Sequence, residues 1–260
     1  MNSERDGAVL RLHLDNPGRR NALDDAAVAA LIEAIEGAGQ DDELRVIVLS
    51  GTGDDFCSGF DVVGRNQPRG ERPRVGSIQR RLPTQAHRLI PLMLEVEVPV
   101  VCVVRGWAVG IGFQLALAAD FTVAARDARF WQPFVSRGFT PDGGAAWLVP
   151  RTVGLARARE LLILGRELSG SEAEAWGLIH RAVDSERLDE EAEALVARLA
   201  ASATVAVGLT KRLLNTGTSL DLRAHLANEA FALELASRSQ DFKEGLAAFV
   251  EKREPRYEGT

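Results

Sequence analysis

The apolar and polar positions of this chain follow two periods, which indicates short strands interleaved with amphipathic helices. Short apolar runs predict strands at residues 8–14, 45–49, 98–104, 120–125, 128–131 and 179–183. Apolar residues three and four positions apart predict helices at about 26–35, 155–164, 187–201, 204–215, 220–236 and 240–253. Two further helices are expected: one begins at residue 77 or 84 and ends at 94, and the other begins near residue 143. No strand pattern remains beyond about residue 186. The sequence therefore predicts an α/β core over residues 1–195 and a helical region over residues 196–260.

Glycine, proline and capping residues predict local boundaries between these elements. Residues 64–77 are rich in glycine, proline and arginine and predict a surface loop. Pro91 is expected to end or kink its helix unless it lies near the helix terminus. Asp24 is a predicted N-cap, and Ser169 or Ser171 with Glu174 resembles a capping box.

The stretch around 98–121 is the clearest candidate for a binding site. A buried strand at 98–104 is followed by Gly106, Gly110 and Gly112 and then by a short apolar helix. A helix that begins at such a turn has free N–H groups and a favourable dipole for negative charge. The alternative is that the glycines only let a helix pack closely, since no GxxxxGK[ST] is present and no GxGxxG follows a strand.

Composition excludes several classes of protein. The 260 residues are 46% hydrophobic and carry a net charge of -6, which suits a large core and disfavours a nucleic-acid partner. The two cysteines, Cys57 and Cys102, lie in apolar surroundings and are expected to be reduced core thiols. The histidines are isolated, so no metal site is expected. No apolar run approaches 18 residues, so we expect no membrane partner, and we expect a cytoplasmic protein.

Four stretches together carry a specific resemblance. They are RRNAL at 19–23, SGTGDDFCSGFD at 50–61, GWAVGIGFQLALAAD at 106–120 and PDGGAAWLVPRTVG at 141–154. In this combination the chain resembles the enoyl-CoA hydratase/isomerase family, the crotonase superfamily, over essentially its whole length. The resemblance implies a spiral of repeated ββα units, and a C-terminal helical region that joins subunits into a homotrimer or a dimer of trimers. It also implies a substrate that is an acyl-CoA thioester.

The same resemblance implies where the thioester oxygen would bind. The donors would be the backbone N–H groups of Phe60, after Gly59, and of Ile111, after Gly110. Negative charge accumulates on that oxygen during acyl-CoA chemistry, and one preorganised donor is worth about 3–4 kcal/mol.

Departures from the family pattern bear on the reaction. Two glutamates activate water in the family's hydratases, and their positions here hold Gln114 and Phe134. Neither residue can exchange a proton at neutral pH, which disfavours simple hydration. Asp142, in the PDGG motif, resembles the aspartate of the isomerase branch, although such an aspartate could also be a helix N-cap.

His87 is the other candidate for proton transfer. It lies 24 residues before Ile111, a spacing similar to that of the general base in the 4-chlorobenzoyl-CoA dehalogenase branch. Three hypotheses about the function therefore stay open. The first is an enoyl-CoA-type isomerase that uses Asp142, and the second is a hydratase or aryl-CoA hydrolytic enzyme that uses Asp142 with or without His87. The third is a non-catalytic acyl-CoA-binding protein. A lone histidine in a helix often has no catalytic role.

Coenzyme A is expected only as part of the substrate, with no permanently bound cofactor. Arg20, or Arg19 instead, resembles the family's basic residue near the phosphates, and a C-terminal lysine, Lys243 or Lys252, would reach CoA, often from a neighbouring subunit. The other predicted contacts are Ala22, Ser58, Gly59, Asp61, Val62, Gly110, Trp131 and Phe134. Several aromatic residues near the presumed pocket favour an aromatic or ring-bearing acyl group. They are Trp107, Trp131, Phe134, Phe139 and Trp147.

Overall fold

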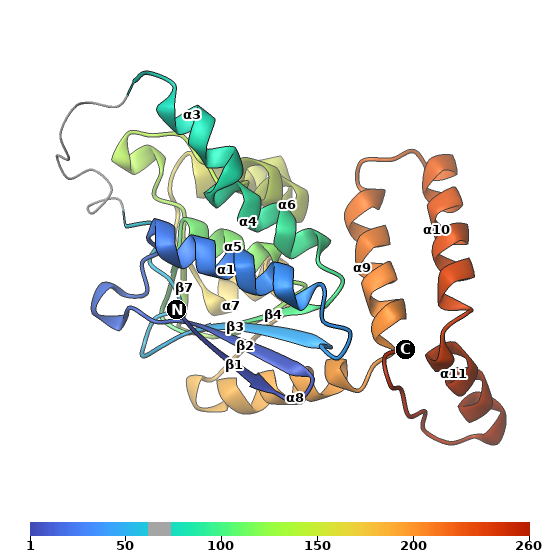
Figure 1. Cartoon of the computed structure of the whole chain (residues 1–260). Helices are drawn as coiled ribbons and strands as arrows, with labels where there is room; N and C mark the ends of the chain where they lie inside the picture. The colour runs from blue at the N-terminus through green and yellow to red at the C-terminus, as the bar shows by residue number, and fades with distance from the viewer. Residues whose placement is uncertain (62–73) are drawn as a thin grey trace.

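The computed structural model describes residues 1–61 and 74–260, and a six-stranded sheet forms its centre (Figure 1). The strand order is β1-β2-β3-β4-β6-β9, and all neighbouring strands are parallel except β1 and β2. The strands are β1 (Asn2–Asp6), β2 (Val9–Leu14), β3 (Val46–Gly51), β4 (Val100–Val104), β6 (Phe121–Ala125) and β9 (Arg181–Val183). Every residue of the central β4 is buried, because parallel sheets are covered on both faces.

The strands of a second, smaller sheet alternate along the chain with the later strands of the first sheet. This smaller sheet has the order β5-β7-β8, with β5 and β7 parallel and β7 and β8 antiparallel. Its strands are β5 (Trp107–Val109), β7 (Arg129–Trp131) and β8 (Leu168–Ser169). Thus β4, β5 and α5 (Ile111–Ala118) form one ββα unit, and β6, β7 and α6 (Ala145–Leu162) form the next. This repetition is the one that the resemblance implied.

Helices cover both faces of the large sheet. Helix α1 packs on β2 and on α4, and α4 packs on α5, while α8 packs on β3, β4 and β6 (Figure 1). The three covering helices are α1 (Asp25–Ala38), α4 (Ala86–Glu95) and α8 (Leu188–Ala200). Two shorter helices are α3 (Ser77–Arg81) and α7 (Gly170–Ala175). Asp24 caps α1 as predicted, since its side chain accepts from the Ala27 N–H at 2.8 Å.

The last three helices project from the sheet and its covering layers (Figure 1). They are α9 (Thr204–Gly217), α10 (Leu222–Ala236) and α11 (Gln240–Glu251). The predicted boundary at residue 195 falls within α8, whose apolar side is buried on the sheet, so the projection begins with α9. Lys211 of α9 forms a buried ion pair with Asp120, and Asn215 donates to the Leu94 carbonyl at 2.8 Å.

Some local predictions were wrong or incomplete. Strand β1 was missed because its five residues are polar and exposed at the sheet edge. Pro91 lies inside α4 and does not end it, since buried side chains on both sides of the proline hold the helix on the core. The capping box joins Ser169 to Glu172, not to Glu174. The predicted loop at 64–77 falls mostly outside the described residues.

Within residues 1–61 and 74–260, no single helix is long and apolar enough to cross a membrane. One sharply bent pair, Ser185–Ala200 with Thr204–Gly217, is long and apolar enough, by length and composition alone.

Candidate active site

An extended segment, residues 56–61, lies between β5 and the loop that holds residues 19–23. On one side the Cys57 N–H donates to the Trp107 carbonyl at 2.8 Å, and the Val109 N–H donates to Cys57 at 2.8 Å. On the other side the Leu23 N–H donates to the Gly59 carbonyl at 2.8 Å. The segment that contains Phe60 is thus fixed from both sides by backbone hydrogen bonds.

Two glycines let this segment approach the start of α5. A Cβ on Gly112 would lie 2.5 Å from the Cys57 carbonyl oxygen, and a Cβ on Gly59 would lie 3.2 Å from that of Val109. Gly59 also has a φ of 104°, which a side chain would disfavour. These close approaches bring the Phe60 segment against the helix that begins at Ile111.

The N–H of Ile111 belongs to the first residue of α5. An N–H group in the first turn of a helix has no carbonyl partner within the helix, so this N–H is suited to an external acceptor. The helix dipole also favours negative charge at this position. Gly110 precedes it with φ 54° and ψ -120°, and donates its own N–H to the Trp131 carbonyl at 3.0 Å. Strand β7 therefore fixes the turn that aims Ile111.

The side chain of Gln114 links α5 to the loop that carries Asp142. Gln114 is fully buried, and its Nε2 donates to the backbone carbonyl of Asp142 at 3.0 Å. Its Oε1 has no partner among the described residues and faces the Cα of Gly143, where any Cβ would collide with it. Gln114 thus holds the 142–143 backbone next to the first turn of α5.

Asp142 is half-buried and does not serve as the N-cap of α6. The N-cap is Gly144, with φ 86°, and the Ala145 N–H donates to the backbone carbonyl of Asp142 at 3.1 Å. The backbone of Asp142 thus meets the start of α6 from outside the helix.

The other predicted proton-transfer residue lies on α4. His87 is half-buried, and its Nε2 is buried without a partner in residues 1–61 and 74–260. Ile90, one turn further along α4, lies 3.5 Å from the position of a Cβ on Gly144. Helix α4 thus packs beside the Asp142 loop.

The predicted aromatic lining is only partly gathered. Phe134 is buried, 6% exposed, with its ring 5.9 Å from that of Phe139. The Trp131 ring instead packs on Trp107, and its indole N–H donates to the Gly165 carbonyl at 2.9 Å. These contacts do not support a lining role for Trp131.

The residues predicted to contact CoA cluster around the 19–23 loop. Ser58 donates its N–H to the Arg20 carbonyl and its hydroxyl to the Arg19 carbonyl, both at 2.9 Å. Arg19 forms an ion pair with Asp61, and the exposed Arg20 lies near Asp55, 3.6 Å away. Val62 lies outside the described residues, and Lys243 lies on α11 in the projecting region.

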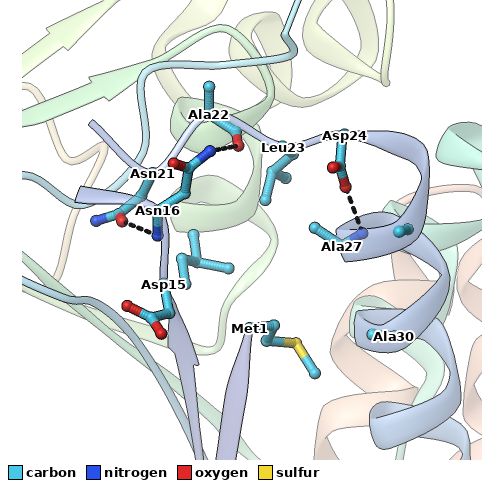
Figure 2. Close-up of a pocket in the computed structure, with 11 residues that line it drawn as sticks. Met1, Asp15, Asn16, Asn21, Ala22, Leu23, Asp24, Ala27 and Ala30 are labelled. Atoms are coloured by element: carbon cyan, nitrogen blue, oxygen red, sulfur yellow. Dashed lines mark hydrogen bonds between the residues drawn. The ribbon is translucent and has the colours of Figure 1, made fainter. Parts of the chain in front are cut away.

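Sequence reasoning missed the role of Asn21, which organises this loop. Asn21 is buried with a φ of 55° and accepts from the Asn16 N–H (Figure 2). Its side chain also donates to the carbonyls of Thr52 and Asp55. Asparagine tolerates that left-handed conformation better than most residues, and this preference was the available signal.

The loop at residues 19–23 borders a pocket of about 450 Å³ that reaches Met1 and the start of α1. Its lining does not include Phe60, Ile111 or Asp142.

Neither a thiolate nor a metal is suggested by the described residues. Burial raises the pKa of the Cys57 thiol to about 12, so it stays protonated at neutral pH. Within residues 1–61 and 74–260, no three His, Cys, Asp or Glu side chains are grouped to hold a metal ion.

The chain is similar to known proteins over nearly its whole length. Residues 4–260 match the family model for enoyl-CoA hydratase/isomerase. The chain is 39% identical to 1,2-epoxyphenylacetyl-CoA isomerase of Escherichia coli, over 96% of this chain and 95% of that protein. It is 32% identical to crotonyl-CoA hydratase of Syntrophomonas wolfei, over 98% of this chain and 96% of that protein. The structure of an enoyl-CoA hydratase from Bacillus anthracis matches with a TM-score of 0.91 at 28% identity, and the match covers 100% of this chain and 99% of that one. These matches confirm the predicted crotonase-type α/β fold and show that the chain belongs to the enoyl-CoA hydratase/isomerase family.

Proposed function

We propose that this family member is an acyl-CoA isomerase that shifts a proton through a thioester enolate. The backbone N–H groups of Phe60 and Ile111 bind the thioester oxygen. The Asp142 carboxylate takes a proton from the α-carbon, and the electron pair of that C–H bond moves toward the oxygen. Asp142 then returns the proton at the γ-carbon as the enolate collapses, so the double bond moves and the mass is unchanged.

The hydrogen bond from Gln114 to the carbonyl of Asp142 carries this proposal. A glutamate at that position would have no N–H to donate, whereas the carboxamide holds the Asp142 backbone in place. Gln114 is therefore a positioning residue for Asp142 in our mechanism. The relatives include an isomerase and a hydratase, so similarity alone leaves the reaction to be tested.

Hydrolytic substitution is the second candidate, and His87 is the observation that favours it. Its buried Nε2 lacks a partner among the described residues and lies on the helix that packs beside the Asp142 loop. An imidazole there could activate water while Asp142 acts as nucleophile. A His87→Ala variant that keeps the wild-type rate would exclude this role.

The test is a panel of CoA thioesters, with 2-enoyl, 3-enoyl, dienoyl and aryl groups, read by mass and chromatography. Isomerisation leaves the mass unchanged, hydration adds one water, and substitution exchanges a substituent for hydroxyl. We expect Asp142→Asn to retain acyl-CoA binding and to lose at least about a hundredfold in rate. Asp42→Asn, at an exposed site, is the matched control. Unchanged turnover by Asp142→Asn would refute the assignment, and a wild type that binds without turnover would favour an acyl-CoA-binding protein.

We also propose that the projecting helices pack against other copies of the chain in a trimer or dimer of trimers. Their exposed apolar side chains support this, because such residues are normally covered by a partner. They include Leu222, Leu226, Phe231, Leu233, Phe249 and Val250. In this assembly Lys243 would reach CoA bound to a neighbour, and Arg20 would meet its phosphates within one chain. A stable monomer at micromolar concentration in light scattering would contradict the proposal.

A further inference from the structure

A buried carboxamide in the 19–23 loop holds three backbone groups. Asn21 is 1% exposed, and its Oδ1 accepts from the Asn16 N–H at 2.9 Å (Figure 2). Its Nδ2 donates to the carbonyls of Thr52 and Asp55, at 2.9 and 2.7 Å. The acceptor and both donors of the carboxamide are therefore used, as burial of such a group requires.

The backbone at this point is in a conformation that few side chains adopt. Asn21 has a φ of 55°, and Arg20 before it has a φ of 48°. Two consecutive residues in the left-handed region are unfavourable unless their surroundings hold them there. The carboxamide supplies that hold, because its hydrogen bonds fix Asn21 to the turn at residues 52–55.

The loop reaches the peptide that carries the Phe60 N–H. Leu23 and Phe60 form a parallel β-bridge. The Leu23 N–H donates to the Gly59 carbonyl at 2.8 Å, and the Leu23 carbonyl accepts from the Asp61 N–H at 2.9 Å. The C=O and N–H of a trans peptide point in opposite directions. Since the Gly59 C=O points to Leu23, the Phe60 N–H of the same peptide points away from the loop.

The opposite side of this segment is the side of β5 and the start of α5. Cys57 and Ala108 form a second parallel bridge, and Phe60 and Ile111 each lie three residues further along these two stretches. The Phe60 N–H therefore points toward the side that holds the second proposed donor. The hydrogen bond from Leu23 fixes this direction, and a rotation of the 59–60 peptide would take the two donors out of line.

We propose that Asn21 is a positioning residue for the oxyanion donor at Phe60. Its carboxamide holds the loop, the loop fixes Leu23, and Leu23 fixes the peptide whose N–H meets the thioester oxygen. The inference rests on the proposed function, because the direction of this N–H affects turnover only if it binds that oxygen. Charge on the oxygen grows toward the transition state, so a misdirected donor lowers kcat more than it weakens binding.

The test combines turnover with the infrared spectrum of a bound thioester. The probe is butanoyl-CoA, which has no double bond to shift. It is isotopically labelled at the thioester carbon, so that the difference from the unlabelled spectrum isolates the carbonyl band. Hydrogen bonds to a carbonyl oxygen lower the frequency of this band, and a role of Asn21 in folding alone would not move it.

Two variants remove the donor groups in different ways. Asn21→Gly keeps the left-handed conformation and removes the carboxamide. Asn21→Asp keeps an acceptor for the Asn16 N–H but has no N–H to donate. Asn215→Ala is the matched control, because it removes a carboxamide of α9 that donates to the Leu94 carbonyl at 2.8 Å. Each protein is measured at a temperature at which its unfolding curve shows it to be folded.

We expect the wild type and Asn215→Ala to lower the carbonyl frequency of the bound probe, and both Asn21 variants to shift the band back toward that of the free thioester. The Asn21 variants should lose about ten- to a hundredfold in kcat, the effect of a misplaced catalytic group, while the Kd of the probe changes by less than about threefold.

A wild-type band and kcat in the folded Asn21 variants would overturn the inference and leave the proposed function standing. An equal loss of kcat in Asn215→Ala would also overturn it, because a loss of stability would then explain the effect. A wild type that does not lower the frequency of the bound carbonyl would overturn the assignment of Phe60 as a donor, and this inference with it.

Discussion

The buried ion pair between α9 and the sheet offers a sharp test of the energetics. Lys211 and Asp120 lie 2.7 Å apart with side chains only 5% and 18% exposed. Burial lowers the pKa of Lys211 and raises the pKa of Asp120, although each charge favours the ionised form of the other. Desolvation therefore outweighs attraction for both partners. Such pairs contribute little net stability, but breaking one leaves a buried charge.

We expect Lys211→Met to reduce the free energy of unfolding by about 3 kcal/mol, the lower end of the range of about 3–5 kcal/mol for one lost partner. The lower end applies because Asp120 still accepts the Val100 N–H at 2.8 Å and is partly exposed. The double variant Lys211→Met/Asp120→Asn removes both charges and keeps an acceptor for Val100. It should recover to within about 1 kcal/mol of the wild type.

Urea unfolding followed by circular dichroism at pH 7 and one protein concentration measures these differences. Arg212→Met, at an exposed site on α9, is the matched control and should change stability by less than about 0.5 kcal/mol. A double variant as unstable as Lys211→Met would refute the reasoning, because the pair would then be net stabilising.

Three further predictions concern the active site and the C-terminal region. Gly112→Ala places a methyl 2.5 Å from a backbone oxygen, so unfolding assays should show that the free energy of unfolding falls by about 1–3 kcal/mol. Gly37→Ala is the control: nothing lies within 4 Å of its methyl, so the free energy of unfolding should rise by about 0.5–1 kcal/mol. Gln114→Glu removes the donor to Asp142 and should cost about 1–3 kcal/mol and lower kcat; an unchanged kcat would contradict its positioning role. A hydrogen bond from an arginine lowers the pKa of Glu244 to about 2, so its contribution to stability is present above about pH 4.5 and is lost toward pH 2. Acid unfolding of Glu244→Gln should lack this step.

The fold was predictable because its signals are local and strong. Buried β-branched runs marked β3 and β4, and helical periodicity marked the four C-terminal helices. Strand β5 was missed because its three residues follow a glycine and its pairing with β7 is visible only in space. Strand β1 was missed because an exposed edge strand has no alternating pattern.

Motifs, not residue types alone, led to the candidate site residues. The resemblance implied roles for Phe60, Ile111 and Asp142, whereas the hydrogen bond from Gln114 to the Asp142 backbone depends on how α5 meets the following loop. The ion pair of Lys211 joins positions 91 residues apart in sequence. Nothing in the local pattern around either partner indicates such a contact.

Gln114 and Phe134 stand where the resemblance expects glutamates, and the two positions are packed differently. At Gln114 the carboxamide lies against the Cα of Gly143, and a Cβ there would also lie 3.2 Å from Ile111. The turn at residues 110–111, the Gln114 carboxamide and the Asp142 loop are thus one packed unit. At Phe134 the position is filled by a buried ring, and a carboxylate there would need solvation or a partner. Glutamates at both positions would place one carboxylate beside a backbone carbonyl and the other in an apolar contact with Phe139. Packing as well as residue identity therefore constrains the two positions, and we predict that neither Gln114→Glu nor Phe134→Glu alone confers hydratase activity.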